Sequence, residues 1–315
     1  MEDALKRENE LEMSLGNRKL GTIVFETTIC VAIAAFAFLG NALLCFSLYK
    51  TPGFRAPQNY YIANLAAADM LFAVLCMPFF LGALIKGKWI FGETFCQIEG
   101  SLVFILVNAS LSTMTLIAVN RFFKMSQSVN NYPKIYSGRN ILLSILLAWT
   151  VSISVVLAVF SFENRPFRFH PGKFLCFLDM ENQGVRFYTL GAYVAVCAVV
   201  FPVMILCYFK VYRKVKAHFD EIANSGHQAS RSFLNEAKIT KMLFVTLVAF
   251  LVCWTPAIIT DIFDAFHGQY SLPRQVYFWQ IVLYASSSAI NPIIYGFMRR
   301  ELRMAYKEVL TCKRR

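Results

Sequence analysis

Charged residues are scarce in this chain. Asp, Glu, Lys and Arg make up 16% of the 315 residues, whereas 57% are hydrophobic and phenylalanine alone occurs 30 times. This balance excludes a soluble globular protein and is typical of an integral membrane protein. The net charge of +12 does not indicate a nucleic-acid partner, because the basic residues fall between apolar segments instead of forming one patch with interleaved aromatic residues.

Long polar segments are also absent. The longest loops between apolar stretches, at about residues 163–186 and 216–235, leave no room for a soluble enzyme domain. The two halves of the chain show no internal repeat and no matched pair of broken helices, which argues against a transporter. No Asn-x-Ser/Thr sequence lies outside the apolar stretches, so we expect no N-glycosylation.

Seven apolar stretches are each long enough to cross a hydrocarbon core of roughly 30 Å. They lie at residues 23–49, 59–86, 93–125, 139–161, 185–215, 236–266 and 273–297. With the N-terminus outside, the inner loops and tail hold 20 of the 31 Lys and Arg residues, so the positive-inside rule places the C-terminus in the cytoplasm. The sequence therefore predicts an all-α membrane protein with an extracellular tail (1–22), a seven-transmembrane helix bundle (23–298) and a short cytoplasmic amphipathic eighth helix and tail (299–315).

Most of the nine cysteines are not expected to form disulfides, because six lie within apolar stretches, where cysteine is usually a small buried hydrophobe. Cys96 and Cys176 both fall on the expected outer, oxidising side, where they could bridge the start of the third span to the loop after the fourth. Cys312 lies on the inner side, just beyond the amphipathic stretch, and is a candidate for palmitoylation.

Asp69 is a carboxylate inside an apolar stretch, and ionisable groups within a membrane are functional by default. Polar side chains of other spans reach a similar depth: Asn41, Ser110, Ser287, Ser288 and Asn291. A carboxylate surrounded by hydroxyl and amide oxygens suits a hard cation such as sodium. The sequence leaves open the alternative that Asp69 is protonated and hydrogen-bonded to the serines.

Short motifs occur in order along the seven spans. They are GN at Asn41, LAAAD at Asp69, Trp89 with Cys96, NRF at Arg121, Trp149, CWTP with Cys253, Trp254 and Pro256, and NPIIY with Asn291, Pro292 and Tyr295. Through these motifs the chain resembles the rhodopsin-like (class A) G-protein-coupled receptors from about residue 23 to residue 312. The resemblance implies a non-enzymatic receptor in the plasma membrane that binds an extracellular ligand and activates a heterotrimeric G protein, with arrestin as a further partner.

The resemblance implies a switch at the cytoplasmic ends of the third and sixth helices. Arg121 would be restrained by Glu236, which precedes Pro256 by twenty residues, about 30 Å of helix. Most of the family carries Asp where this chain has Asn120, so one local restraint on Arg121 is expected to be missing. The motifs assign further switch roles to Tyr208, Phe250, Trp254, Pro256, Asn291, Pro292 and Tyr295.

The fifth span departs from the family pattern. Tyr208 follows Pro202 by six positions, where the family usually shows eight. Either Pro202 is displaced and Tyr208 keeps its role, or the fifth helix lacks the usual bulge.

The ligand class is inferred from residues that are missing. Val103 stands where amine receptors carry Asp, and Ala285 stands where an opsin carries its retinal lysine, so neither a cationic amine nor retinal is expected. The stretch from Asn120 to Asn140 most resembles the melatonin receptors, although Val159 stands in place of their ligand-holding asparagine and NPIIY in place of NAxxY. We expect a small neutral or weakly polar aromatic ligand and an inhibitory-type G protein. The expected pocket comprises Val103, Leu106, Val107, Asn108, Trp254, Ile258 and Tyr284, roofed by Phe177.

Several alternatives stay open at this point. Asp261 and Asp264 lie at the rim of the expected pocket, where they are either solvated or meet a basic ligand, or Arg168 and Lys173 of the loop after the fourth span. A peptide or lipid ligand is an alternative to an aromatic one. A further alternative is a receptor fold that no longer signals and serves as a scaffold.

Overall fold

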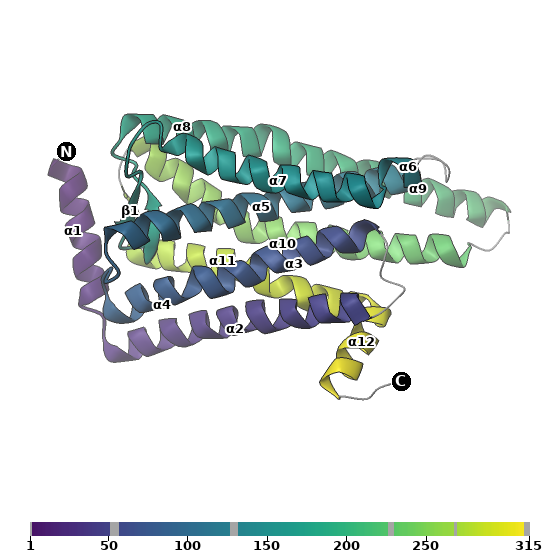
Figure 1. The fold of residues 1–315 in the computed structure, drawn as a ribbon, viewed down its shortest axis with the longest axis horizontal. Coiled ribbons are helices and arrows are strands. Elements are labelled where there is room, and N and C mark those ends of the chain that lie inside the picture. Colours follow the sequence, from purple (N-terminus) through teal and green to yellow (C-terminus); the bar gives the residue numbers. More distant parts are fainter. Residues whose placement is uncertain (1, 51–56, 127–131, 226–229, 268–269, 312–315) are drawn as a thin grey trace.

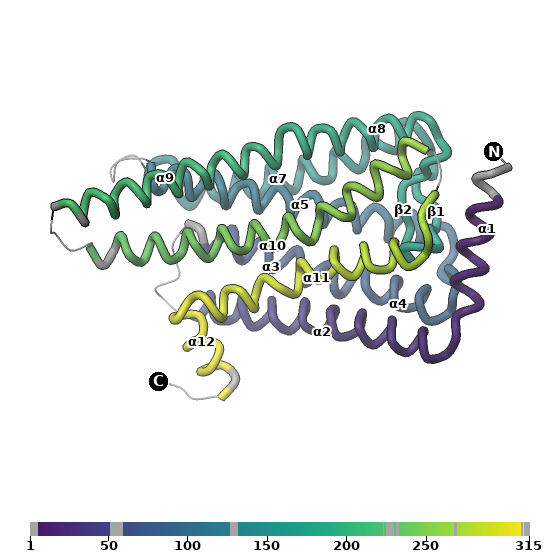
Figure 2. Tube along the Cα trace, turned by 180° about the vertical axis from the view of Figure 1, so that it is seen from behind, coloured from purple at the N-terminus to yellow at the C-terminus, as the bar shows by residue number. Residues whose placement is uncertain are grey.

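Long helices running side by side make up most of the chain (Figures 1 and 2). The structure, a computed structural model, describes residues 2–50, 57–126, 132–225, 230–267 and 270–311. In chain order, the elements are α1 (Glu2–Gly16), α2 (Leu20–Lys50), α3 (Pro57–Leu75), α4 (Met77–Lys86), α5 (Glu93–Ser126), α6 (Tyr132–Ile135), α7 (Gly138–Val159), β1 (Phe167–His170), β2 (Leu175–Leu178), α8 (Gln183–Ala195), the π-helical turn η2 (Val196–Val200), α9 (Phe201–Ser225), α10 (Arg231–His267), α11 (Arg274–Met298) and α12 (Arg300–Leu310).

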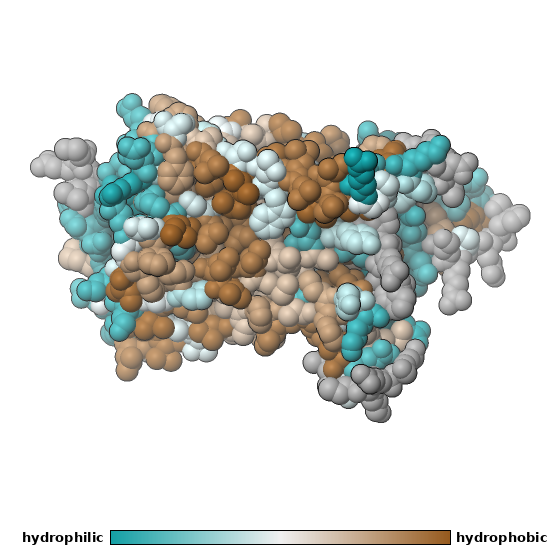
Figure 3. Space-filling model, viewed as in Figure 1, coloured by the Kyte–Doolittle hydropathy of each residue, from teal (hydrophilic) through white to brown (hydrophobic). Residues whose placement is uncertain are grey.

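Seven helical segments within the described residues are long and apolar enough to cross a membrane. They are Leu20–Lys50, Asn59–Lys86, Glu93–Ser126, Gly138–Val159, Gln183–Ile222, Phe233–His267 and Arg274–Met298. Apolar side chains cover much of the middle of the molecule, and hydrophilic side chains gather toward its two ends (Figure 3). The predicted seven-transmembrane bundle is therefore confirmed, and α12 follows it as a short separate helix.

Prolines interrupt or lie within several spans. The second span is divided into α3 and α4 at Cys76, two residues before Pro78, which has no N–H to donate to a helical hydrogen bond. Pro256 and Pro292 lie inside α10 and α11. At Gly40 a Cβ atom would lie only 3.1 Å from the Pro292 Cγ, so the absence of a side chain there allows α2 and α11 to approach closely.

One end of the bundle carries a disulfide and a short β-hairpin, and we call it the disulfide end; the opposite end, which carries α12, we call the α12 end. Strands β1 and β2 pair antiparallel, with Phe169 opposite Cys176. Cys176 is bonded to Cys96 near the start of α5, which confirms the predicted bridge. The hairpin itself was not part of the all-α prediction. Strand β2 is completely buried.

Helix α1 lies across the disulfide end instead of running along the bundle (Figures 1 and 2). Its side chains Leu11 and Leu15 are buried. Just after α1, Arg18 donates to Glu26 of α2 at 2.6 Å, and Arg274 of α11 donates to the other oxygen of the same carboxylate at 2.7 Å. The segment predicted only as a polar tail therefore forms a helix that is tied to the bundle.

The buried apolar residues form two main clusters, one toward each end. The cluster at the disulfide end includes Val103 and the hairpin residue Phe177, and the cluster at the α12 end includes Trp254. Val107 and Tyr284 pack against both. The level at which the clusters meet contains the cavities described next.

Candidate functional site

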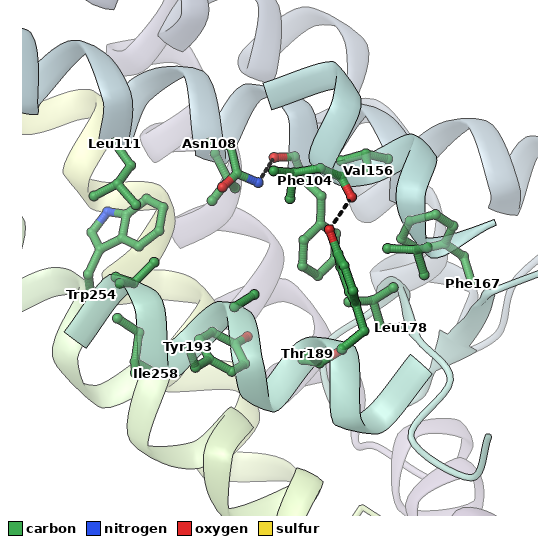
Figure 4. A pocket seen from close by; sticks show the side chains of 16 residues that line it. Phe104, Asn108, Leu111, Val156, Phe167, Leu178, Thr189, Tyr193, Trp254 and Ile258 are labelled. Atoms are coloured by element: carbon green, nitrogen blue, oxygen red, sulfur yellow. Dashed lines mark hydrogen bonds between the residues drawn. The ribbon is translucent and has the colours of Figure 1, made fainter. Parts of the chain in front are cut away.

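A cavity of about 80 Å³ lies between α5, α7, α8 and α10, and we call it the first cavity. Figure 4 shows Phe104, Asn108, Trp254 and Ile258 around it. Asn108 donates its amide N–H to the Phe104 carbonyl oxygen at 2.8 Å, which fixes the orientation of its side chain. Most of the other lining side chains are apolar, so this cavity suits a mainly apolar ligand.

A second cavity of about 70 Å³ lies beneath the hairpin, between α5, α10 and α11. Five residues line both cavities: Phe104, Val107, Tyr193, Trp254 and Ile258. The hairpin contributes Lys173, Leu175 and Phe177 as the roof of the second cavity. The two cavities therefore adjoin one another, and a single ligand placed there would contact residues of both.

The structure places most of the predicted pocket residues around these two cavities. They are Val103, Val107, Asn108, Phe177, Trp254, Ile258 and Tyr284. Leu106 does not line either one and instead borders a smaller cavity around Asp69. The structure therefore places Leu106 apart from the other predicted pocket residues, beside Asp69 and Phe72 of α3.

Sequence reasoning missed Tyr193 and Gln280, which supply polar groups to the second cavity. It also missed the fourth-span contribution of Val155 and Val156, next to Val159, in the first cavity. The sequence did contain a signal for these two residues, because a tyrosine and a glutamine stand out as polar residues within otherwise apolar spans. Their common partner, Asp261, lies on a third helix, so no local spacing relates the three.

Asp261 is the centre of a buried polar cluster that we call the Asp261 cluster, formed with Lys173, Tyr193 and Gln280. Lys173 Nζ lies 2.5 Å from Asp261 Oδ1, and the Gln280 amide donates to the same oxygen at 2.8 Å. The Tyr193 hydroxyl donates to Asp261 Oδ2 at 2.7 Å. The side chain of Lys173 is 1% exposed and that of Asp261 is 8% exposed, so the carboxylate is not a solvated rim group. The sequence left open whether Asp261 is solvated, meets a basic ligand or pairs with a basic residue of the loop. The structure shows that it pairs with Lys173.

Asp264 is also buried and accepts a hydrogen bond from the Tyr277 hydroxyl at 2.8 Å. The other basic loop residue, Arg168, points elsewhere and lies 3.1 Å from Glu181 and 3.9 Å from Glu8 of α1. Burial raises the pKa of Glu8, and the Arg168 charge lowers it in part. Arg168 therefore joins the hairpin to the helix that crosses this end, and does not take part in the Asp261 cluster.

His170 lies fully buried at the end of β1. Its Nδ1 accepts backbone N–H groups from Gly172 at 3.1 Å and from Lys173 at 3.3 Å. The ring packs on Tyr270, with ring centroids 3.8 Å apart. Burial, and then the nearby Lys173 charge, hold the pKa of His170 well below its ordinary value of 6.5. The imidazole is therefore neutral at physiological pH and shapes the turn that carries Lys173.

A small cavity nearer the α12 end contains the predicted sodium-site residues. Its lining includes Asp69, Ser110, Ser287, Ser288 and Asn291. The Asn291 amide donates to Asp69 Oδ2 at 3.0 Å, and Trp254 Nε1 donates to Ser287 Oγ at 3.3 Å. The available ligand atoms are carboxylate and hydroxyl oxygens, which is a donor set that fits a hard cation. Trp254 lines this cavity and also the first and second cavities, so its side chain lies between them.

Asn41 does not line the cavity around Asp69. Its amide donates to the Ser288 backbone carbonyl at 2.9 Å and to the Ala37 carbonyl at 2.7 Å. The side chain therefore ties α2 to α11 next to the site instead of supplying a ligand atom to it.

At the α12 end, Arg121 Nη1 lies 3.0 Å from Glu236 Oε2, and Lys124 lies 4.0 Å from the same carboxylate. The Arg121 side chain is fully buried, whereas that of Glu236 is 25% exposed. Asn120 accepts a 3.5 Å contact from Arg121 and donates to the Tyr132 hydroxyl at 3.0 Å. Asn120 therefore supplies no charge to Arg121, and its amide also connects α5 to Tyr132 of α6.

The irregular fifth span resolves the question raised by Pro202. The π-helical turn η2 (Val196–Val200) ends directly before α9, so the helix does contain a bulge. Tyr208 is buried in the same cluster as Tyr295 and Phe250. The alternative of a fifth helix without a bulge is therefore wrong. Among the described residues, the Tyr208 hydroxyl has no hydrogen-bond partner.

Helix α12 packs against the bundle through Leu302, which is fully buried. The Tyr306 hydroxyl donates to the Pro292 carbonyl at 3.4 Å, and Arg299 donates to Asn59 at 3.1 Å. The helix therefore begins close to the NPIIY motif. Cys312, the predicted palmitoylation site, lies outside the described residues.

The sequence was compared with known proteins. The profile of the 7 transmembrane receptor (rhodopsin family) group matches residues 40–295. The Allatostatin-A receptor of Bombyx mori is 24% identical over 284 residues, covering 89% of this chain and 78% of the relative. The 5-hydroxytryptamine receptor 4 of Homo sapiens is 26% identical, covering 90% and 79%. The Melatonin receptor type 1B-B of Danio rerio is 28% identical, covering 92% and 80%.

Proposed function

Because the chain belongs to the rhodopsin family of seven-transmembrane receptors, we propose that it binds a small neutral or weakly polar aromatic ligand from outside the cell. Members of this family are G-protein-coupled receptors and not enzymes. The relatives are named for allatostatin-A, 5-hydroxytryptamine and melatonin, so family membership alone leaves the ligand open. The ligand class must come from the chemistry of the two cavities.

This proposal rests mainly on one observation: the negative charge of the carboxylate that lines these cavities is already balanced by a lysine of the same chain. Among the described residues that line the first and second cavities, Asp261 is the only acidic one, and it is paired with Lys173 at 2.5 Å. A cationic ligand would have to displace this lysine, whereas a neutral ligand leaves the pair intact. The apolar walls then favour an aromatic body.

Gln280 supports a ligand that carries a hydrogen-bond donor. Its amide nitrogen faces two acceptors, Asp261 Oδ1 at 2.8 Å and the Ala257 carbonyl at 3.4 Å, which fixes the orientation of the amide. Its oxygen is buried and has no hydrogen-bond partner among the described residues. A buried acceptor without a partner costs about 1–3 kcal/mol, so an N–H or O–H group of the ligand would gain by reaching it.

The test is a ligand panel applied to cells that report several G-protein pathways, with melatonin and other indoles first. Val107→Trp places a large side chain at the junction of the two cavities and is expected to abolish the response to any active compound. Val252→Trp, on the exposed face of α10, is the matched control and should respond normally. A ligand that acts equally well on both variants would place the binding site elsewhere.

We infer that the disulfide end faces outward and that the α12 end meets the G protein at the plasma membrane. The excess of Lys and Arg in the segments toward the α12 end supports this orientation. The short, basic second and third loops at that end favour an inhibitory-type G protein, with arrestin as a second partner. An antibody against a tag placed before Met1 should stain unpermeabilised cells, and staining only after permeabilisation would reverse the orientation.

We further propose that the cavity around Asp69 holds a sodium ion. Asp69 and Ser110 would supply a carboxylate and a hydroxyl oxygen, with Ser288 next to them. The ion would contribute positive charge that lets Asp69 stay ionised within the membrane. Because Trp254 separates this cavity from the ligand cavities, sodium and ligand are expected to influence one another through that side chain.

Signalling separates this proposal from a scaffold that only keeps the receptor fold. The purified chain in lipid nanodiscs should accelerate nucleotide exchange on a G protein, even at a basal rate. Binding of the ligand without exchange on any G-protein class would favour the scaffold.

A further inference from the structure

Lys173 enters the second cavity from the turn of the hairpin and not from a helix. It lies between β1 and β2, and its single backbone N–H donates to the carbonyl oxygen and to Nδ1 of His170, which holds the turn in shape. Its side chain is 1% exposed and ends among α8, α10 and α11. A lysine of an outer loop is therefore buried at the level of the ligand cavity, where its ammonium group occupies space that a ligand could otherwise reach.

The surroundings of the Lys173 ammonium have the features of an alkylammonium binding site. The Asp261 carboxylate lies 2.5 Å away and supplies the opposite charge. The Phe177 ring centroid lies 3.3 Å from Nζ, and the Tyr277 ring centroid lies 5.7 Å away. A carboxylate together with aromatic faces is the combination that proteins use to bind organic cations.

The carboxylate is also positioned independently of Lys173. Tyr193 donates to one Asp261 oxygen and Gln280 donates to the other, from α8 and α11 respectively. Three helices thus hold the anionic group in place. Removing the lysine would leave a buried carboxylate that is oriented but lacks a counter-ion.

We propose that Asp261, with the rings of Phe177 and Tyr277, forms a subsite for a primary alkylammonium group, and that Lys173 fills it as a cation supplied by the chain itself. An attached group acts at an effective concentration of about millimolar or higher, so free amines at lower concentration do not displace it. The subsite accepts an external amine once the lysine side chain is shortened. This inference does not depend on the ligand or on G-protein coupling.

The experiment uses the full chain, purified in detergent, with Lys173→Ala. This substitution removes the atoms from Cγ to Nζ, and n-propylammonium has the same number of carbon and nitrogen atoms as the part removed. The melting temperature of Lys173→Ala should fall by several degrees, because a buried carboxylate is left unpaired. Added n-propylammonium chloride should raise it again in a saturable manner.

Two comparisons make the result specific. The neutral analogue 1-propanol at the same concentration should not stabilise Lys173→Ala, and wild-type protein should not respond to n-propylammonium. Adding Asp261→Asn to Lys173→Ala should remove the response, because the carboxylate that binds the cation is gone. Equal effects of the amine and the alcohol, or a response that survives Asp261→Asn, would overturn the proposal.

A second set of variants covers the case in which Lys173→Ala does not fold. Lys173→Met keeps most of the length of the side chain without its charge, and it can be combined with Asp261→Asn. The double variant should lose less stability than the sum of the stability losses of the two single variants, because it leaves no unpaired charge. Additive losses would show that the two groups are not coupled and would also overturn the proposal.

Discussion

Arg121 and Glu236 join α5 to α10 at the α12 end, with Nη1 and Oε2 3.0 Å apart. The Arg121 side chain is fully buried, whereas that of Glu236 is 25% exposed. Pro256 lies twenty residues further along α10, where it interrupts the helical hydrogen bonds. A tilt of α10 about this proline would separate the pair without breaking the helix elsewhere. The pair therefore favours the arrangement seen in the structure, in which the ends of α5 and α10 lie together, and we call this the closed arrangement.

Glu236→Ala should raise signalling in the absence of ligand. The pair is partly screened by solvent, so its loss is expected to cost the closed arrangement about 1 kcal/mol, a roughly fivefold change in the balance of states. Basal nucleotide exchange on the G protein measures this change at matched surface expression. Glu221→Ala, at an exposed position of α9, serves as the control. Identical basal activity in both variants would show that the pair is not a restraint.

Arg121→Ala should abolish G-protein activation while the protein still reaches the cell surface. Arg121 is buried and paired with Glu236, so under the proposed function its guanidinium would become available to a partner when Glu236 moves away. Surface staining and ligand binding are expected to stay within about twofold of wild type, because Arg121 lines neither the first nor the second cavity. Full signalling by this variant would exclude the guanidinium as the coupling group.

Sodium should stabilise the chain through Asp69. A ligand that binds only the folded state raises the melting temperature with its concentration. Wild-type protein should therefore melt at a higher temperature in sodium chloride than in choline chloride of equal ionic strength. Asp69→Asn removes the charged ligand atom, and its melting temperature should be the same in both salts. A sodium effect of equal size in this variant would place the ion elsewhere.

His170 should make the disulfide end sensitive to acid. Its pKa is lowered in the folded chain, first by burial and then by the Lys173 charge, so the folded state stays neutral where the unfolded state takes up a proton. The free energy of unfolding should therefore fall as the pH drops below about 6.5, by at most about 1.4 kcal/mol per pH unit from this residue.

The variant His170→Asn retains an acceptor for the backbone N–H groups and cannot titrate. The difference in melting temperature between wild type and His170→Asn should shift in favour of the variant between pH 7.5 and pH 5.5. Taking the difference cancels the contributions of Glu8 and Asp179, whose pKa values burial raises. His267→Asn, at an exposed position, is the control. A constant difference across this range would show that His170 does not titrate as proposed.

Loss of the disulfide should destabilise the folded chain markedly. Cys96 and Cys176 are 80 residues apart, and closing a loop of that length in the unfolded state corresponds to about 4.5 kcal/mol in the chain-entropy view. Replacing both with serine should sharply reduce surface expression and lower the melting temperature of the fraction that folds. Cys197→Ser, at an exposed position in the fifth span, should have little effect.

The spans could be predicted, and the switch residues could be proposed, because each rests on a local pattern. A long apolar run specifies a membrane helix wherever it packs, and Asn291, Pro292 and Tyr295 lie within a single motif. The sodium-site residues could be grouped because depth in a membrane follows directly from position along a span. These predictions needed no knowledge of which helices touch.

The Asp261 cluster could not be predicted in the same way. Lys173 and Asp261 are 88 residues apart, and the position of the lysine depends on a hairpin that the disulfide holds in place. The docking of α1 could not be predicted for the same reason, because Leu15 and Arg18 contact partners on several segments that are distant in the sequence. Long-range contacts of this kind leave only isolated polar or apolar residues in the sequence.

The wide turn η2 has a consequence for every side chain that precedes it in the fifth span. An α-helix advances about 100° per residue, so one residue more in this turn rotates α8 by about that angle relative to α9. Tyr193 and Thr189 face the first cavity with this offset in place. Deleting a single residue between Val196 and Val200 would rotate both away from the first cavity, so the phase of the helix selects which side chains face it.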